Sequence, residues 1–331
     1  MKPDDPTRTL VWLHGRAELQ RLGGMLAPVT FSAPGRPDFQ PMQVAPWADE
    51  PGSAALPGLM RRLRGDWLCL PFGRTDPLAG LPSGWTSHAP SDAWGHGYGS
   101  HHDWTWRPAP DPLSLAMTIT TPDGMRLTRT LHAVADAPAL DVEVRIEVAT
   151  PCTLPVALHP TLRLDAGRVV LDVPHAGKGL TYPVPAEPEV SLLVPNCAFD
   201  DLRAVPRADG SLADLTRYPQ PRDSEELLQL QGVSGPVSLH YLDLGWAFTL
   251  DWDRTLLPDM LLWVSHRGRQ YAPWNGRHLA LGLEPVNSVF DIGRVATPPP
   301  DHPLAARRGI ALTPERPCSI RYRIAGQPVS S

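Results

Sequence analysis

Apolar and polar side chains alternate along most of this 331-residue chain. The alternation is clearest at 140–148, where leucine, valine and isoleucine occupy every second position and charged residues fill the positions between. Residues two apart lie on the same face of a β-strand, so this pattern predicts a strand with one buried face. Shorter alternating runs predict further strands at 113–120, 125–132, 168–173, 190–194, 236–242, 246–252, 260–266, 279–284 and 318–324.

Helical periodicity is scarce by comparison. The best helical candidate is Ser224–Leu230, where Asp223 or Ser224 could cap a first turn. The 40 prolines and 27 glycines imply many turns between short strands. Strands joined in this way predict an all-β fold, an antiparallel sandwich or barrel. No change of composition marks a linker, and 196–224 resembles a long excursion from the sheet, so we expect a single domain over 1–331.

The segment ALHPTLRL at 157–164 places a histidine before a proline inside an alternating run. Alternate residues divide into an apolar face, which we interpret as core, and a face that holds Ala157, His159 and Thr161. Proline lacks a backbone N–H, so we expect an edge, a bulge or the end of pairing at Pro160. The histidine would then look over an accessible sheet surface. The alternative is a partly exposed histidine without a function.

The segment HLALGLEPVNS at 278–288 repeats this arrangement. Glu284 precedes a proline, and Ala280 and Gly282 are the small residues before it on the same face. Small residues let a flat ligand approach the backbone, so the two segments predict a ligand-facing sheet surface. A histidine and a glutamate facing one cavity, here His159 and Glu284, suit general acid–base catalysis near neutral pH. The alternative is a surface carboxylate at a strand end.

Histidine and tryptophan cluster in WGHGYGSHHDWTW at 94–106. Clustered histidines are potential metal ligands, but a glycine-rich loop without regular ligand spacing does not predict a metal site, and we expect none. Tryptophan rings beside polar side chains also suit sugars, because the C–H face of a sugar stacks on the ring. Core packing is the alternative explanation for several of the 11 tryptophans.

Three arginines lie in the turn-rich segment 265–278, just before the glutamate strand: Arg267, Arg269 and Arg277. Arginines can clamp an anionic group of a substrate through paired hydrogen bonds. Equally, these three could form a solvated loop face.

Charge and composition narrow the range of partners. A formal net charge of −5 with interspersed signs predicts neither nucleic acid nor a membrane surface as partner. The N-terminal sequence has no apolar stretch of signal-peptide length, and no run is long enough to span a bilayer, so we expect a cytoplasmic protein. The 4 cysteines are widely separated and predict neither a zinc site nor a disulfide framework.

Five short segments resemble the galactose mutarotase (aldose 1-epimerase) superfamily, in the order of that family and across nearly the whole chain. The resemblance implies a large antiparallel β-sandwich and a cofactor-free reaction that interconverts the α and β anomers of a free sugar. By the same resemblance, Glu284 is the base at the anomeric hydroxyl and His159 is the acid at the ring oxygen. The segments are LGGMLAPVTF at 22–31, LCLPFGRTD at 68–76, HGYG at 96–99, ALHPTLRL at 157–164 and LGLEPVNS at 281–288.

The resemblance also implies residues that hold the sugar. An arginine, Arg74, is expected to hydrogen-bond a hydroxyl, although Gly73 stands before it where the family usually has asparagine. Asp243, Asp251 and Asp253 are the candidates for the family's sugar-binding aspartate. His96 is expected on the ring-oxygen side of the sugar. The predicted substrate-binding set consists of His96, Arg74, Arg267, Trp263 and Asp243.

Other functions stay open beside this one. The chain could be a non-catalytic carbohydrate-binding protein of the same fold, because a fold does not determine a function. It could act on an anionic hexose, such as a phosphorylated one. A sugar hydrolase would need two carboxylates, of which the sequence identifies only Glu284. In each case the expected partner is a small-molecule sugar bound without a cofactor by a monomer or homodimer.

Overall fold

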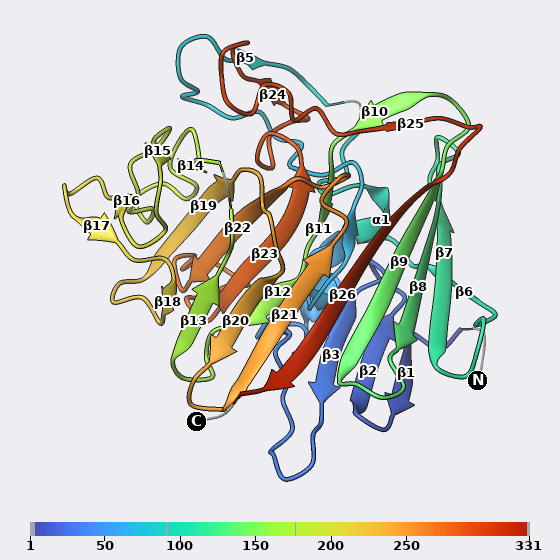
Figure 1. Cartoon of the computed structure of the whole chain (residues 1–331). Helices are drawn as coiled ribbons and strands as arrows, with labels where there is room; N and C mark the ends of the chain where they lie inside the picture. The colour runs from blue at the N-terminus through green and yellow to red at the C-terminus, as the bar shows by residue number, and fades with distance from the viewer. Residues whose placement is uncertain (1–3, 91, 176, 330–331) are drawn as a thin grey trace.

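The structure is a computed structural model that describes residues 4–90, 92–175 and 177–329, and its ordered elements are mostly antiparallel strands (Figure 1). The all-β antiparallel fold expected from the alternation is confirmed. In this part of the chain the largest sheet has nine strands. In spatial order they are β18 (Arg217–Tyr218), β13 (Val169–Asp172), β20 (Val237–Tyr241), β21 (Trp246–Trp252), β26 (Cys318–Pro328), β9 (Ala139–Glu147), β8 (Arg126–Ala133), β7 (Ser114–Thr120) and β6 (Thr105–Arg107).

A second sheet packs against the first and carries both sequence segments that hold the predicted acid and base. Among the described residues it has eight strands. They are β15 (Ala198–Phe199), β14 (Gly179–Thr181), β19 (Ser224–Leu230), β22 (Asp259–His266), β23 (Leu279–Asn287), β11 (Val156–Leu158) and β4 (Leu68–Cys69), with β12 (Thr161–Arg163) also paired to β23.

Smaller elements surround the two large sheets. None of the helices in the described part of the chain is both long enough and apolar enough to cross a membrane. The small sheets are β1 (Thr7–Trp12), β2 (Gly15–Gln20) and β3 (Leu26–Phe31); β10 (Cys152–Leu154) with β25 (Ile310–Leu312); β16 (Val205–Pro206) with β17 (Leu212–Ala213); and β24 (Ala296–Thr297) with β5 (Thr86–Ser87). The helical turns are η1 (Ser53–Ala55), η2 (Gly58–Arg62) and α1 (Tyr98–His101).

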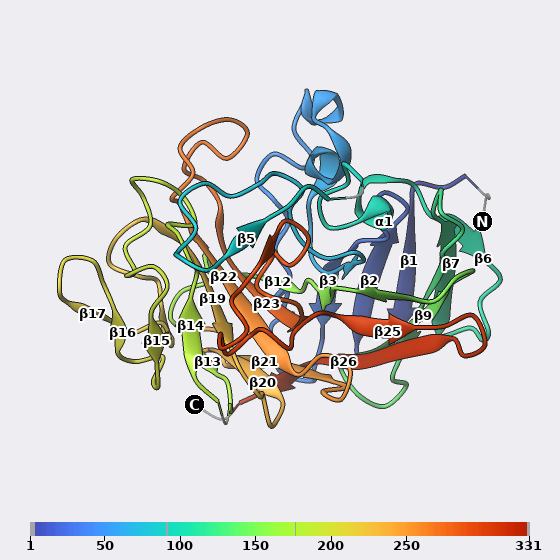
Figure 2. The same ribbon diagram turned by 90° about the horizontal axis from the view of Figure 1, so that it is seen from above.

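Alternation along β22 and β23 divides the side chains between two different environments. Leu262 and Leu283 point to one face and join the main hydrophobic cluster, which also contains Phe248 of β21 and thus joins the two large sheets. Leu261 and Trp263 point to the other face and join a second cluster. Figure 2 shows that α1, β5 and the light-blue helical turns form a layer over this outer face of the sheet.

Two elements predicted from the sequence are wrong. The segment expected to be helical, Ser224–Leu230, is strand β19. Its glutamates Glu225 and Glu226 are buried and hydrogen-bonded, so the polar positions that suggested a solvated helix face belong to a strand covered on both faces. The strand expected at 190–194 is a turn followed by an isolated bridge at Leu193. The other predicted strands are present.

Candidate active site

His159 and Glu284 are direct neighbours across two strands. β11 and β12 pair with β23 in one continuous register that places His159 opposite Glu284. The ladder is interrupted at Pro160: its carbonyl accepts a hydrogen bond from the Leu283 N–H, at 2.8 Å, but proline has no N–H to return. The predicted break in pairing at this proline is therefore observed. The Nε2 atom of His159 lies 3.3 Å from Oε1 of Glu284.

These two side chains lie in the wall of a cavity of about 320 Å³ on the outer face of the second sheet. A cavity of this size is at the small end of the range for ligand pockets. The sheet also contributes Leu227, Leu261 and Trp263. Surrounding loops and the helical turns η2 and α1 contribute the remaining lining residues, which are Pro57, Leu59, Met60, Leu63, Trp67, Gly95, His96, His101, Arg269, Trp274 and Asp291.

The imidazole of His159 is held on both sides. Its ring stacks on Trp67 with centroids 4.0 Å apart and planes 15° apart. Its Nδ1 lies 3.2 Å from the hydroxyl of Thr161, which leaves Nε2 directed at the glutamate. His159 is only 5% exposed and Glu284 only 2%, so the surface is not the open one expected from the sequence. Both side chains line the cavity.

The small residue before Glu284 has a different role from the one expected. Gly282 was predicted to leave the sheet floor open to a ligand. A Cβ at this position would instead lie 2.7 Å from Oε1 of Glu284 and 3.1 Å from the Cβ of Trp263. The space above the glycine is therefore occupied by the carboxyl group, and glycine lets that group lie over the sheet toward His159.

Burial shifts the two pKa values in opposite directions. It raises the pKa of Glu284 well above its usual range, and the nearby carboxyl of Asp291 raises it further. Burial lowers the pKa of His159 well below its usual range, with the neighbouring His96 acting in the same direction. A buried site disfavours charge, so the two shifts favour neutral Glu284 beside neutral His159, with the pair's single proton on the glutamate.

Asp291 lies seven residues after Glu284 and lines the same cavity. Its Oδ1 accepts a hydrogen bond of 2.6 Å from the Tyr182 hydroxyl, and its carbonyl accepts one of 2.7 Å from the Arg74 N–H. Burial raises the pKa of Asp291, while Tyr182 and Arg74 oppose that rise. The departure at Gly73 has a cause here, because its φ is +113° and a Cβ would collide with the Asp291 carbonyl.

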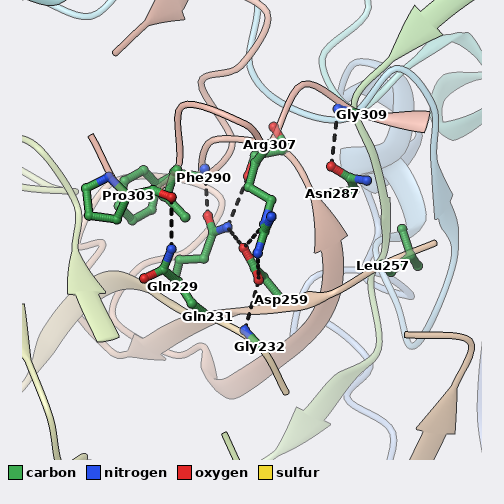
Figure 3. Close-up of polar contacts among 12 residues, drawn as sticks. Gln229, Gln231, Gly232, Leu257, Asp259, Asn287, Phe290, Pro303, Arg307 and Gly309 are labelled. Atoms are coloured by element: carbon green, nitrogen blue, oxygen red, sulfur yellow. Dashed lines mark hydrogen bonds and ion pairs between the residues drawn. The ribbon is translucent and has the colours of Figure 1, made fainter. Parts of the chain in front are cut away.

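A hydrogen-bonded network holds the loop that carries Asp291 (Figure 3). Gln229 of β19 accepts a hydrogen bond from the Phe290 N–H at 2.8 Å and donates to Asp259 at 3.0 Å. Asp259 is fully buried and also accepts from Arg307 at 2.7 and 3.1 Å. The network therefore anchors the residue next to Asp291 to two strands of the sheet.

A second chain of polar contacts orients Trp263. Its indole Nε1 donates to the buried carboxylate of Glu225 at 2.6 Å. The hydroxyl of Ser265 donates to the same carboxylate at 3.1 Å and lies 2.9 Å from Nδ1 of His278. Burial lowers the pKa of His278 to about 3, so this imidazole is neutral at pH 7. Arg269 lies 3.3 Å from Glu225 and above Trp274, 4.6 Å from its ring centroid.

The structure brings four of the predicted site residues to one cavity. His159, Glu284, His96 and Trp263 all line it. The His96 ring lies 5.6 Å from that of His159, and burial lowers the pKa of His96 to about 4. Arg74 lies behind Asp291, to which its N–H donates, rather than in the lining.

The other two predicted residues lie elsewhere. Asp243 is in the turn after β20 of the nine-stranded sheet, where it pairs with Arg168 at 2.6 Å. Arg267 follows β22 and points toward Asp223, 3.8 Å away, with its side chain 47% exposed. Neither residue lines the cavity. Within the described residues, no group of three or more His, Cys, Asp and Glu side chains is arranged to hold a metal ion.

Several lining residues were missed by the sequence analysis. Trp67 lies opposite His159 because β4 pairs with β11, a contact between segments about 90 residues apart that no local pattern reports. Trp274 and Asp291 lie in loops, where periodicity carries no information. Asp291 could have been suspected only from its place shortly after the glutamate motif. Leu59 and Met60 lie in a helical turn that the sequence analysis did not consider.

Comparisons with known proteins agree with this architecture. No family model matches the chain, and no curated protein matches it in sequence. Solved structures do match over nearly its whole length, and they show that its fold is that of galactose mutarotase-like proteins, as the resemblance implied.

Three of these structures illustrate the likeness. A candidate aldose 1-epimerase from Escherichia coli K12 is 14% identical, with a TM-score of 0.66 and coverage of 98% of this chain and 99% of that one. A galactose mutarotase-related enzyme from Lactobacillus acidophilus is 12% identical, with a TM-score of 0.58 and coverage of 98% and 99%. A GalM/aldose epimerase homologue from C. elegans is 15% identical, with a TM-score of 0.58 and the same coverage.

Proposed function

We propose that this protein is an aldose 1-epimerase, which interconverts the α and β anomers of a free sugar. The observation that carries the proposal is the contact of 3.3 Å between Nε2 of His159 and Oε1 of Glu284 in the wall of a cavity that is also lined by tryptophans. An acid and a base at one site are what anomer exchange requires. The fold shared with mutarotase-like proteins supports the same reaction.

The proposed reaction starts from a site in which His159 and Glu284 hold one proton between them. Burial favours the proton on Glu284 in the free site, so this proton first passes to His159 across the 3.3 Å contact. The Glu284 carboxylate then removes the proton of the anomeric hydroxyl while His159 donates its own to the ring oxygen. The bond between C1 and the ring oxygen breaks and leaves an open-chain aldehyde. After rotation about the C1–C2 bond, Glu284 returns its proton to the carbonyl oxygen and His159 takes one from the attacking hydroxyl. The ring closes as the other anomer.

The walls of the cavity are suited to a sugar ring. Trp67, Trp263 and Trp274 all line it, and tryptophan faces stack on the C–H faces of sugars. Asp291 and His96 add polar groups at the same site. Asp291 is a hydroxyl acceptor in this proposal, and neutral His96 is a hydrogen-bond partner on the ring-oxygen side.

The proposal predicts that Glu284→Gln and His159→Gln each lower kcat by about 10²–10⁴-fold, the usual contribution of a positioned acid or base. The measurement is anomer exchange of freshly dissolved aldoses, followed by polarimetry or by the anomeric proton signals in NMR. Glu143→Gln, in a partly exposed carboxylate of the other sheet, serves as the matched control and keeps full activity.

A wild-type protein that equilibrates a broad panel of aldoses no faster than buffer would refute the enzymatic proposal. Calorimetric binding of a sugar without any acceleration would assign the chain to non-catalytic carbohydrate binding instead.

A further inference from the structure

One wall of the cavity is apolar. The segment that contains η2 contributes Pro57, Leu59, Met60 and Leu63, none of which has a polar side-chain atom that forms strong hydrogen bonds. A hydroxyl buried against such a wall loses its water and gains no partner, which is costly. A fully hydroxylated sugar therefore fits this wall poorly.

The apolar wall is held in place by main-chain and aromatic contacts. The indole of Trp47 donates to the Met60 carbonyl at 2.8 Å, and the Leu63 carbonyl accepts from the Ala45 N–H at 3.0 Å. The Trp47 ring also packs edge-on against Trp274, with centroids 4.6 Å apart. These contacts fix the backbone that carries the apolar side chains, so they hold these side chains in the wall of the cavity.

Among the described residues, the cavity lining offers no free arginine or lysine to an anionic sugar. Arg269 is the only arginine or lysine among the described residues that line it. Its guanidinium lies 3.3 Å from each of two carboxylates, Glu187 and Glu225. Glu284 and Asp291 add further carboxyl groups to the lining. Binding an anion would require breaking these pairs beside like charges, which disfavours it.

The other arginines of the loop are paired as well. Arg277 forms two contacts with Glu50, at 2.5 and 3.2 Å, outside the cavity lining. Arg267 faces Asp223. The loop that kept a phosphorylated hexose open in the sequence analysis therefore presents no arginine that awaits an anion.

We infer that the substrate is an uncharged sugar that carries an apolar substituent, with 6-deoxyhexoses as the matching class. This inference rests on the proposed mutarotase function. In a 6-deoxyhexose a methyl group replaces the hydroxymethyl group on C5, the carbon bonded to the ring oxygen that His159 protonates. The methyl group packs against Leu59, Met60 and Leu63, where the C6 hydroxyl of the parent hexose would be left without a partner.

The test compares sugars that differ only at C6. We expect kcat/KM to favour the 6-deoxyhexose about 10- to 100-fold in each of three pairs, D-fucose with D-galactose, L-rhamnose with L-mannose, and 6-deoxy-D-glucose with D-glucose. Glucose 6-phosphate is expected to react more slowly than glucose. Calorimetric Kd values for the same pairs give the same comparison independently of turnover.

A nearly isosteric variant links the preference to the wall. Met60→Gln adds an amide at the lining and is expected to reduce the ratio of 6-deoxyhexose to hexose at least several-fold. Leu56→Gln, in the same segment but outside the lining, is the control and keeps the wild-type ratio. Thermal unfolding of both variants verifies that they are folded.

The outcomes separate the two proposals. Equal kcat/KM and Kd within every pair, or a preference for the phosphorylated sugar, overturns the apolar-substituent inference and leaves the mutarotase function standing. A preference that persists in Met60→Gln overturns the assignment to this wall. Selective binding of 6-deoxyhexoses without turnover supports the apolar pocket but refutes the enzyme, and no binding at all refutes both.

Discussion

At the scale of single residues, the site depends on two ionisable groups that are buried together. The pKa values of an isolated glutamate and an isolated histidine are about 4.3 and 6.5, so such a pair would hold one proton only between these two pH values. Burial moves the pKa of Glu284 up and that of His159 down, each well away from its usual range. These shifts favour the single proton on Glu284, so His159 binds the second proton at low pH and Glu284 loses the last one at high pH.

These directions predict which group limits the activity at each end of the pH–activity profile. Activity falls at low pH only below the lowered pKa of His159, where a second proton binds, and at high pH only above the raised pKa of Glu284, where the last proton leaves. We expect kcat/KM to stay level through pH 7 and to decline in alkaline solution. The profile of initial anomer-exchange rates, corrected for the rate in buffer, measures this.

A substitution of Asp291, whose carboxyl group also lines the cavity, tests the direction of the pKa shift of Glu284. Asp291 raises the pKa of Glu284, so Asp291→Asn is expected to move the alkaline decline to lower pH. A narrow optimum between about pH 4.3 and 6.5 in the wild type would contradict the shifted pair.

At the scale of elements, β19 shows how a strand interior can carry polar residues at both of its faces. Gln229 is fully buried, and each of its amide atoms has a partner on the loop after β23 or on β22. The strand thereby ties the loop of Asp291 to the sheet (Figure 3). A buried amide satisfied in this way stabilises one loop conformation, whereas a half-satisfied one destabilises the fold.

Gln229→Met keeps the size of the side chain and removes all three hydrogen bonds. Because the Phe290 N–H and the Asp259 carboxylate then lose a partner, we expect the free energy of unfolding to fall by about 1–3 kcal/mol. Urea denaturation monitored by tryptophan fluorescence measures the change. Gln327→Met, at an exposed position of β26, is the matched control and should alter stability little. Equal stability of the two variants would show that the network does not hold the loop.

At the scale of the whole molecule, a buried ion pair joins the two large sheets. Arg129 of β8 and Tyr322 of β26 belong to the nine-stranded sheet, and both contact Asp66, which directly precedes Trp67 and β4 of the second sheet. Asp66 is 0% exposed and Arg129 only 1%. The pair therefore fixes the position of the tryptophan on which His159 stacks, from the opposite sheet.

Removing one partner of this pair leaves a buried charge without compensation. Arg129→Met is expected to lower the free energy of unfolding by about 3–5 kcal/mol. Arg321→Met, in an exposed pair with Glu143, is the control and should change it by less than about 1 kcal/mol. Urea unfolding curves of both variants test this, and a similar small effect at the two sites would mean that the buried pair adds no stability.

Local patterns reported the elements more reliably than the site. The run at 140–148 alternates strictly because one face is buried and the other wet, and it forms β9 at nearly the predicted bounds. The pattern misled at Ser224–Leu230, where buried glutamates imitate a solvated face. The local pattern also could not report the ion pair of Asp243 with Arg168, because Arg168 lies 75 positions away in the chain. A side chain's partner decides its role, and distant partners leave no periodic signal.

The sequence by itself determined the all-β fold, since a side-chain period of two can bury one face only in a strand. It also determined that a histidine and a glutamate each stand directly before a proline in an alternating run. The tertiary structure alone decided that these residues face each other, because strand register arises from pairing between distant segments. It likewise decided their protonation and the apolar wall above them, since burial and cavity shape depend on what packs around a residue rather than on its neighbours in sequence.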